Sequence, residues 1–165
     1  MNLQSLAIRR FATICTVLSF FVVAGCAGKK TSENTTATPN TEENSLGDSD
    51  SGKAMGLETV HFPYDSFVLD GAAKKTLDSN ASVLKEKSSL KVQVEGHCDQ
   101  RGGIQYNIAL GEKRAMGVKK YLEDHGVAEV RITTISYGKE RLLEQATTEA
   151  AYAKNRRANF VITSK

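Results

Sequence analysis

Apolar and polar positions divide the chain into three stretches. Residues 11–24 form an apolar run, residues 29–56 contain almost no apolar side chain, and the remainder repeats apolar positions at regular spacing. A segment as polar as 29–56 buries too little surface to offset the entropy lost when it becomes ordered. We therefore expect a leader over 1–25, a flexible linker over 26–56 and one folded domain over 57–165.

Within the expected domain, the spacing of apolar residues switches between that of strands and that of helices. Leu90, Val92 and Val94 alternate with polar neighbours, which indicates a half-buried strand. The predicted elements are a strand over 59–62, a helix capped by Asp70 that runs through Leu84, a strand over 90–95, a helix through 108–122 followed by Gly126, a strand over 130–137 with a bulge at Thr133–Thr134, a short helix over 148–154 and a strand over 158–162. This order predicts an α+β fold with helices on one face of a sheet.

The apolar leader ends at a cysteine. Two arginines precede the run 11–24, as in a secretory signal, and the run is shorter than the about 20 residues that span a bilayer. Residues 23–26 resemble a bacterial lipobox, in which the chain is cut before a cysteine that carries acyl chains. This resemblance implies lipidation of Cys26, and Ala27 in place of Asp implies transfer to the outer membrane. A plain signal peptide or an inner-membrane helix is the alternative.

Composition and charge exclude some classes of function. The net charge is +3 without a clustered basic face, there is no Trp, and the five Tyr and six Phe are scattered. Nucleic-acid binders carry basic patches or stacking platforms, so we expect no nucleic-acid partner. The three cysteines, Cys15, Cys26 and Cys98, match neither a zinc-site spacing nor a disulfide framework. We expect no metal and no cofactor.

A polar, glycine-rich turn after the strand at 90–95 carries the most distinctive chemistry. Asp99 lies in this turn with Gly102 and Gly103, and Arg114 lies on the following helix beside its apolar stripe. Asp99 can accept hydrogen bonds from an ammonium group, and Arg114 can bind a carboxylate through two parallel hydrogen bonds. The alternative is that the two side chains pair with each other or cap the turn.

Other reactive side chains near this turn fit poorly with catalysis or metal binding. Cys98 follows a histidine directly, which is the wrong geometry for a nucleophile and its base, and the spacing suits no metal. Cys98 is therefore interpreted as a small residue that fills the turn. Arg156 and Arg157 precede the last strand, where they face a ligand or form structural ion pairs.

Several motifs in register resemble the OmpA-like C-terminal domain family, and within it the peptidoglycan-associated lipoproteins. The motifs are residues 96–102, 106–107, 110–115, 136–140 and 155–157. The resemblance covers roughly residues 58–163 and implies a βαβαβ-type domain with a mixed sheet. It also implies non-covalent binding of peptidoglycan through meso-diaminopimelate.

The resemblance assigns roles to five residues. It implies that Asp99 binds the ammonium group of diaminopimelate and that Arg114 binds its carboxylate. Asp65 and Phe62 match residues that line the ligand groove, and Asn107 matches a residue that braces the loop. Two positions depart from the family pattern: Pro63 has no N–H to donate, and Cys98 stands where relatives have Thr or Ala and adds sensitivity to oxidation.

The resemblance also implies a location and partners. It places the domain on the periplasmic side of the outer membrane, held there by its lipid anchor, with TolB, the periplasmic propeller protein of the Tol system, as a partner. The implied role is non-enzymatic support of envelope integrity and of outer-membrane constriction during division. One alternative is the same wall-binding role outside the Tol system. Another is a wall hydrolase that uses Glu95 or Asp99 as an acid, which requires two carboxylates flanking one bond.

Overall fold

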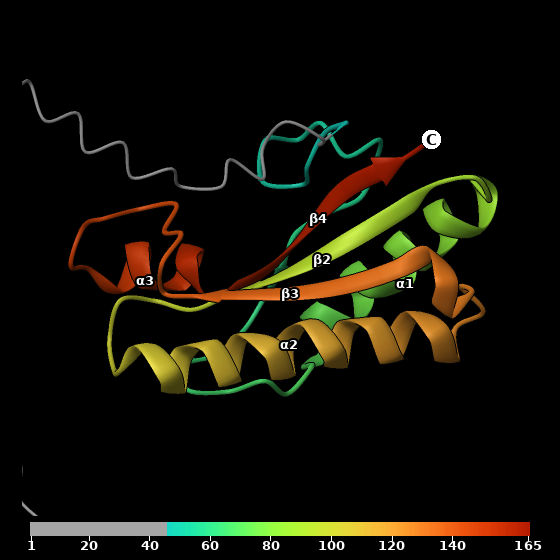
Figure 1. Cartoon of the computed structure of the whole chain (residues 1–165). Coiled ribbons are helices and arrows are strands. Elements are labelled where there is room, and N and C mark those ends of the chain that lie inside the picture. Colours follow the sequence, from blue (N-terminus) through green and yellow to red (C-terminus); the bar gives the residue numbers. More distant parts are fainter. Residues whose placement is uncertain (1–45) are drawn as a thin grey trace, which may run out of the picture. The chain divides into compact units, whose positions relative to one another are not determined.

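The structure, a computed structural model, describes residues 46–165. The predicted leader, the lipidation at Cys26 and the linker up to residue 45 lie outside the described residues. Figure 1 shows the remaining elements, which are, in chain order, β1 (Val60–His61), α1 (Gly71–Glu86), β2 (Lys91–His97), α2 (Ile104–Asp124), the 3-10 helix η2 (Glu129–Arg131), β3 (Ile132–Gly138), α3 (Glu149–Asn155) and β4 (Arg157–Ser164).

The four strands form one mixed sheet in the order β1-β4-β2-β3. β2 and β3 are parallel because α2 crosses between them, whereas β4 pairs antiparallel with both β1 and β2. α1 and α2 lie on the same face of this sheet (Figure 1). The predicted α+β fold, with helices on one face of a mixed sheet, is confirmed.

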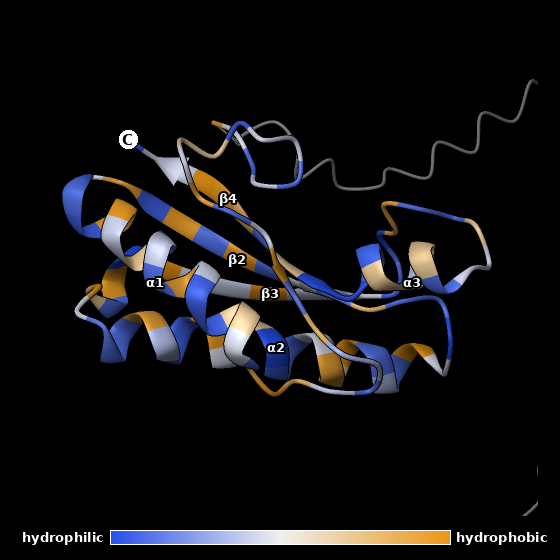
Figure 2. Cartoon of the chain, turned by 180° about the vertical axis from the view of Figure 1, so that it is seen from behind, coloured by the Kyte–Doolittle hydropathy of each residue, from blue (hydrophilic) through white to orange (hydrophobic). Residues whose placement is uncertain are grey.

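The core lies between that face and the two helices. Hydrophobic positions alternate along β2 (Figure 2), and Val92 and Val94 are buried against the helices. Leu77 on α1 and Leu122 on α2 are fully buried against the same core. No helix within residues 46–165 is long and apolar enough to cross a bilayer.

Two predicted helix ends are confirmed. The Asp70 side chain accepts a hydrogen bond from Ala73 N at 2.8 Å, which satisfies a free donor in the first turn of α1. α2 ends at Asp124, and Gly126 adopts φ +92°, the left-handed conformation that terminates many helices.

The predicted third strand differs from the structure at two points. Val130 lies in η2 and is 84% exposed, so the strand begins only at Ile132. The pairing of β3 with β2 is continuous through Thr133 and Thr134, and its register shifts only where His97 pairs with Gly138. The predicted bulge is therefore wrong: the polar pair reflects the partial exposure of an edge strand, not an irregular backbone.

Residues 46–56 pack on the domain, although we predicted a linker there. The backbone N–H groups of Leu46 and Ser49 donate to carbonyls of β4 at 3.0 and 2.9 Å. Arg157 Nε lies 2.7 Å from Asp50 Oδ2, and both side chains are largely buried. The domain boundary expected at residue 57 is therefore too late, because polar side chains of this segment find polar partners on β4 that its composition alone does not reveal.

A side chain on α1 fixes the segment that leads into β1. Asn80 on α1 is fully buried, and its Nδ2 donates to Glu58 O at 2.8 Å while its Oδ1 accepts from Glu58 N at 2.9 Å. An amide that donates and accepts in this way satisfies both backbone groups of Glu58. α1 is thereby fixed to the segment that leads into β1.

Candidate functional site

A polar pocket of about 140 Å³ lies at the end of β2, beside the N-terminal half of α2. Its walls come from the loop after β1, the turn between β2 and α2, α2 itself and the residue before β4. The lining residues are Tyr64, Asp65, Cys98, Asp99, Arg101, Gly102, Tyr106, Asn107, Leu110, Arg114 and Arg156. Four of the predicted site residues, Asp65, Asp99, Asn107 and Arg114, therefore line one pocket.

A close contact between β2 and α2 brings the turn and the helix together. Gly96 and Gly111 face each other, and a Cβ at Gly96 would overlap the carbonyl oxygen of Gly111. A Cβ at Gly111 would lie only 2.8 Å from the carbonyl oxygen of Gly96. Because neither residue has a side chain, Arg114, about one turn further along α2, reaches the end of β2.

Arg114 forms the buried floor of the pocket. It is completely buried, and its Nε, Nη1 and Nη2 donate to the carbonyl oxygens of Ser66, His97 and Pro63 at 2.8, 2.7 and 3.2 Å. Burial lowers its pKa, against the attraction of nearby acidic groups. No hydrogen bond or ion pair joins this guanidinium to a carboxylate among the described residues, so Arg114 and Asp99 do not pair with each other. We expected Arg114 to border the apolar stripe, whereas it lies inside it.

Asp99 is held by two other arginines. Its Oδ1 accepts from Arg101 N and Arg101 Nε, both at 3.1 Å, and its Oδ2 accepts from Arg101 Nη2 at 2.6 Å and Arg156 Nη1 at 3.3 Å. Burial by itself would raise the pKa of Asp99, but these hydrogen bonds lower it, so the group is a carboxylate. The backbone contact also makes Asp99 a cap of the turn, as the alternative interpretation proposed.

Asp65 and Asn107 complete the polar wall. Asp65 is exposed and adopts φ +51°, a left-handed conformation that Asp tolerates better than most residues, and it accepts a hydrogen bond from the Tyr106 hydroxyl. Asn107 Nδ2 donates to the carbonyl oxygens of Arg101 and Gly103 at 2.8 and 3.0 Å. The bracing contact predicted for Asn107 is therefore present.

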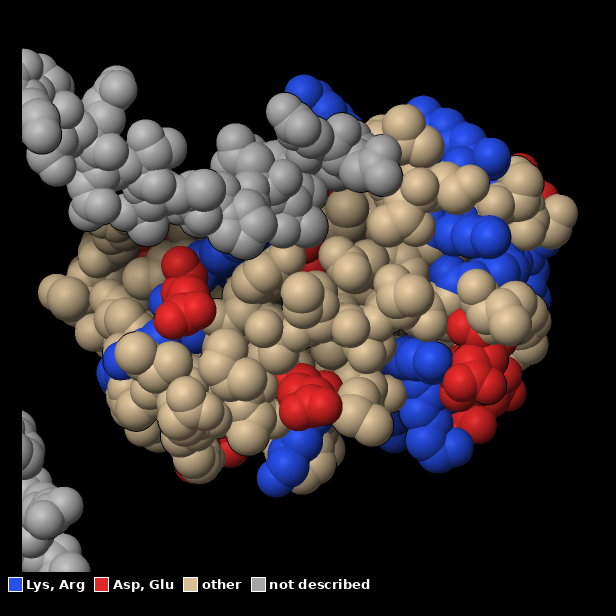
Figure 3. All heavy atoms as spheres, in the orientation of Figure 1, with Lys and Arg blue, Asp and Glu red and all other residues tan. Residues whose placement is uncertain are grey.

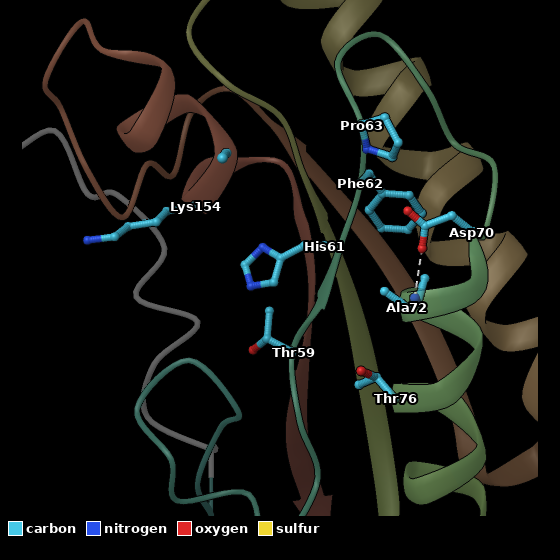
Figure 4. Close-up of a pocket in the computed structure, with 10 residues that line it drawn as sticks. Thr59, His61, Phe62, Pro63, Asp70, Ala72, Thr76 and Lys154 are labelled. Atoms are coloured by element: carbon cyan, nitrogen blue, oxygen red, sulfur yellow. Dashed lines mark hydrogen bonds between the residues drawn. The ribbon is translucent and has the colours of Figure 1, made fainter.

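Phe62 does not line this pocket, contrary to the prediction. It is buried in the core with its ring 5.0 Å from Arg114 Cζ. Together with Pro63 it lines a different cavity, of about 520 Å³, between β1 and the start of α1 (Figure 4). The chain turns after Pro63, so Tyr64 leaves the core and lines the polar pocket instead.

Arg101 is a pocket residue that we did not predict. Its Cζ lies 4.1 and 4.2 Å from the ring centroids of Tyr64 and Tyr152, which sandwich the guanidinium. Its proximity to Asp99 in the sequence was a usable signal, because an Asp often accepts from the backbone two residues on. The two tyrosines come from distant segments, and no pattern in the sequence connects them.

Arg156 forms the structural ion pairs that we gave as one interpretation of the basic pair before β4, and it also lines the pocket. Its Nη1 contacts Asp99 and also Glu149, at 2.8 Å. Its Nε donates to Phe62 O at 3.1 Å, which fixes the side chain to the segment after β1. Arg157 instead pairs with Asp50 and is structural.

Cys98 is packed beneath the pocket. Its side chain is 2% exposed, its Sγ lies 3.4 Å from Asn107 O, and Arg114 Nη1 donates to it at 3.5 Å. Burial raises the pKa of the thiol, against the charge of Arg114. A protonated, buried thiol reacts slowly, so Cys98 acts as a small core residue.

Glu95 belongs to a separate polar cluster. It lines a cavity of about 710 Å³ with His97 and Asn159, whereas Asp99 lines the pocket described above. Glu95 Oε2 lies 3.4 Å from His97 Nε2 and accepts from Asn159 Nδ2 at 3.0 Å. Burial opposes these contacts, but they lower the pKa of Glu95. Two ionised carboxylates in different cavities do not suit a hydrolase that protonates and attacks one bond.

Charge is mixed over the surface. On the face seen in Figure 3, Lys and Arg gather mainly toward the right-hand side, Asp and Glu lie beside them in smaller patches, and the middle of the face is uncharged. Among residues 46–165, no three His, Cys, Asp or Glu side chains gather as metal ligands would. The pocket, which gathers three arginines and two carboxylates, is therefore a more distinctive site than the surface charge.

Comparisons with known proteins identify the family of this domain. The model of the OmpA family matches residues 61–156. Peptidoglycan-associated lipoproteins of Pasteurella multocida and Haemophilus influenzae are 45% identical over 100 residues and 39% identical over 136 residues, spanning 61% and 82% of this chain and 67% and 89% of theirs.

Solved structures support the same relationship. A crystal structure of the peptidoglycan-associated lipoprotein from Burkholderia pseudomallei is 35% identical, with a TM-score of 0.61 over 63% of this chain and 88% of that one. The C-terminal domain of Helicobacter pylori MotB has a TM-score of 0.62 over 67% of this chain and 87% of that one, at 19% identity, which shows a shared fold alone. The chain thus belongs to the OmpA family, with peptidoglycan-associated lipoproteins among its relatives.

Proposed function

We propose that the domain binds peptidoglycan non-covalently through the side chain of meso-diaminopimelate. The distal end of this residue is a zwitterion, with an ammonium group and a carboxylate on one carbon. The observation that carries the proposal is a pocket in which the buried Arg114 guanidinium has no carboxylate partner among residues 46–165, while Asp65 and Asp99 supply negative charge. Each end of the zwitterion therefore has an opposite charge to meet.

The pocket is organised before any ligand enters. Three backbone carbonyls orient Arg114, so its charge is already desolvated and directed. A ligand carboxylate would neutralise this charge, which favours binding more strongly in a buried site than in water. Asp99 and Asp65 would attract the ammonium group from the opposite wall. Because Arg114 is already held in place, little entropy is lost at this side of the pocket when the ligand binds.

The names of the relatives and the N-terminal sequence support the remaining parts of the proposal. The relatives in Pasteurella multocida and Haemophilus influenzae are named for association with peptidoglycan and for being lipoproteins. The sequence at residues 23–26 and the polar stretch after it suit a lipid anchor at Cys26 followed by a tether. The protein would then link the outer membrane to the cell wall.

Three synthetic stem peptides test the ligand without altering the protein. The first carries meso-diaminopimelate, the second carries lysine in its place and so lacks the distal carboxylate, and the third carries diaminopimelate with its distal amine acetylated. Desolvated charge contacts are worth about 2–5 kcal/mol each, so the second and third should bind the full-length protein at least about thirtyfold more weakly, as measured by calorimetry. Equal affinity for all three peptides would reject the proposal.

Asp99→Asn is the protein variant that matches this test. It keeps the size and the acceptor oxygen of the side chain but removes the negative charge, so the full-length protein should fail to co-sediment with purified peptidoglycan. Arg114→Ala is less informative because it also removes hydrogen bonds from three backbone carbonyls. Asp78→Asn, an exposed carboxylate on α1, is the control and should bind normally.

We further propose TolB as a partner and a role in envelope integrity and outer-membrane constriction during division. Support for this part comes from the family relationship and not from a surface identified in the structure. Co-purification of the full-length protein with the periplasmic propeller protein from the same cells tests it. Wall binding without such a complex would favour the alternative, a wall-binding lipoprotein outside the Tol system.

A further inference from the structure

All acceptor positions of the Asp99 carboxylate are occupied by hydrogen bonds. A carboxylate offers about four lone-pair positions, and Asp99 receives four hydrogen bonds: three from Arg101 and one from Arg156. An incoming ammonium group, which needs the same oxygens, must therefore replace a donor that is already bound.

The donors of Asp99 differ in how easily they can leave. The Arg156 side chain is 9% exposed and is also held by Phe62 O, so it is fixed in the core. The Arg101 side chain is 34% exposed and supplies two of the four hydrogen bonds through its guanidinium, whereas its backbone N–H is fixed by the turn. The guanidinium of Arg101 is therefore the donor that a ligand can displace.

Arg101 keeps favourable contacts when it releases Asp99. Its guanidinium lies between the rings of Tyr64 and Tyr152, which stabilise a cation from both sides. Its Nη1 also lies 3.5 Å from Glu149 Oε2, an exposed carboxylate at the start of α3. A small movement away from Asp99 thus exchanges one carboxylate for another without exposing an unpaired charge.

We propose that Arg101 is a resident counter-ion of Asp99 that competes with the ammonium group of the ligand. This inference rests on the proposed binding of diaminopimelate. Binding is then an exchange of cations at Asp99, so only a ligand that brings its own positive charge can open the site. Arg101 would weaken binding of every ligand and would reject those without a cation, which makes it a specificity-determining residue.

Arg101→Gln tests the exchange directly. Removal of the competing cation should tighten binding of the diaminopimelate stem peptide to the full-length protein by about twofold to fivefold, the upper part of the range for an exposed ion pair. Arg141→Gln is the matched control: Arg141 also stacks on a tyrosine ring, at 3.8 Å from the centroid of Tyr137, but lines the separate cavity with Glu95. Its affinity for the peptide should equal that of the wild type.

The outcomes separate the two proposals. If Asp99→Asn abolishes binding but Arg101→Gln leaves it unchanged or weakens it, the ligand assignment stands and the exchange is wrong. If Asp99→Asn binds like the wild type, the ligand assignment itself fails. A measurement on the wild-type protein avoids dependence on the folding of a variant: the Arg101 Nε–H signal in nuclear magnetic resonance should lose its protection from solvent exchange at saturating stem peptide. Unchanged protection would overturn the proposal.

Discussion

At the scale of single residues, Arg114 is unusual because it is a fully buried cation surrounded by carbonyl oxygens instead of carboxylates. Carbonyl dipoles orient a guanidinium but do not cancel its charge. The side chain therefore has two functions: it joins three chain segments, and it leaves a positive potential inside the pocket.

The structural function of Arg114 predicts a loss of stability on its removal. Arg114→Ala leaves the carbonyls of Ser66, His97 and Pro63 without this donor, which should lower the free energy of unfolding by about 3 kcal/mol or more. Urea denaturation measures the change. Lys113→Ala, at the exposed neighbouring position, should cost less than about 1 kcal/mol, and equal losses in both variants would contradict this account.

His97 predicts how stability depends on pH. Burial lowers the pKa of His97 from its ordinary value of 6.5, against the hydrogen bond to Glu95. The folded protein therefore binds this proton less well than the unfolded chain does. The contribution of His97 to stability is complete above about pH 6.5 and is lost as the pH falls toward the lower pKa of the folded state. Urea midpoints should decrease on acidification below neutral pH.

The variant His97→Gln tests whether His97 causes this decrease of stability with falling pH. Glutamine does not titrate, so the decrease between about pH 7 and pH 5 should become smaller. Glu95 adds a second decrease below its ordinary pKa of 4.5, because its pKa is also lowered in the folded state. If the urea midpoint of the variant decreases with pH as steeply as that of the wild type, the acid sensitivity comes from other groups.

The residue patterns predicted where the pocket lies, but they did not predict which contacts hold its side chains. The strand–turn–helix order was enough to bring Asp99 and Arg114 toward one site, because a helix that follows a strand packs back on it. Arg101 follows Asp99 by only two residues, but Tyr64 and Tyr152, which contact its guanidinium, reach the site from other segments. Contacts between distant segments leave no periodic signal in the sequence, so Arg101 was missed.

At the scale of elements, the contact between β2 and α2 determines the geometry of the pocket. Gly96 and Gly111 allow the backbones to approach more closely than residues with side chains would. Every side chain on the first turns of α2 takes its position relative to β2 from this contact. The pocket is therefore a property of how two elements pack, as well as of the residues that line it.

Two glycines of α2 provide a matched pair of substitutions. Gly111→Ala places a Cβ against the carbonyl of Gly96 and should cost about 3 kcal/mol, since overpacking displaces the backbone. In Gly117→Ala the nearest atom, Phe67 O, is 4.0 Å away, so the alanine should stabilise the helix by about 0.5–1 kcal/mol. Thermal unfolding of both variants measures whether each substitution stabilises or destabilises the protein. Destabilisation by both would argue against a specific contact between Gly96 and Gly111.

Element types were predictable where periodicity was strong and local. The helix caps at Asp70 and Gly126 and the alternation along β2 were all present in the sequence before the fold was known. The errors came from the edge of the sheet, where Thr133 and Thr134 in β3 are partly or fully exposed and the apolar pattern weakens. Periodicity reports burial, so it fails first where a strand is only half covered.

At the scale of the whole molecule, the folded unit includes residues that composition assigned to the linker. The segment 46–56 follows β4 through backbone hydrogen bonds and through the pair of Asp50 with Arg157. Ala54 within it is 1% exposed and belongs to the core. Low hydrophobicity therefore did not prevent order here, because the partners that stabilise the segment lie about 110 residues away in the sequence.

A comparison of two shortened chains tests this boundary. A chain that starts at residue 57 loses the partner of the buried Arg157, which should cost about 3 kcal/mol relative to one that starts at residue 46. Chemical denaturation of both measures the difference. Asp50→Asn in the longer chain should reproduce part of the loss, and two chains of equal stability would restore the boundary at 57.

The position of this segment also has a mechanical consequence. Residues 46–56 are the N-terminal part of the region that the structure describes, so tension applied from the N-terminal side reaches them before it reaches the sheet. Their detachment would release about 11 residues, or roughly 35 Å of extended chain. The segment would then extend under load and lengthen the chain. The central strands, and the pocket at their end, would keep their shape.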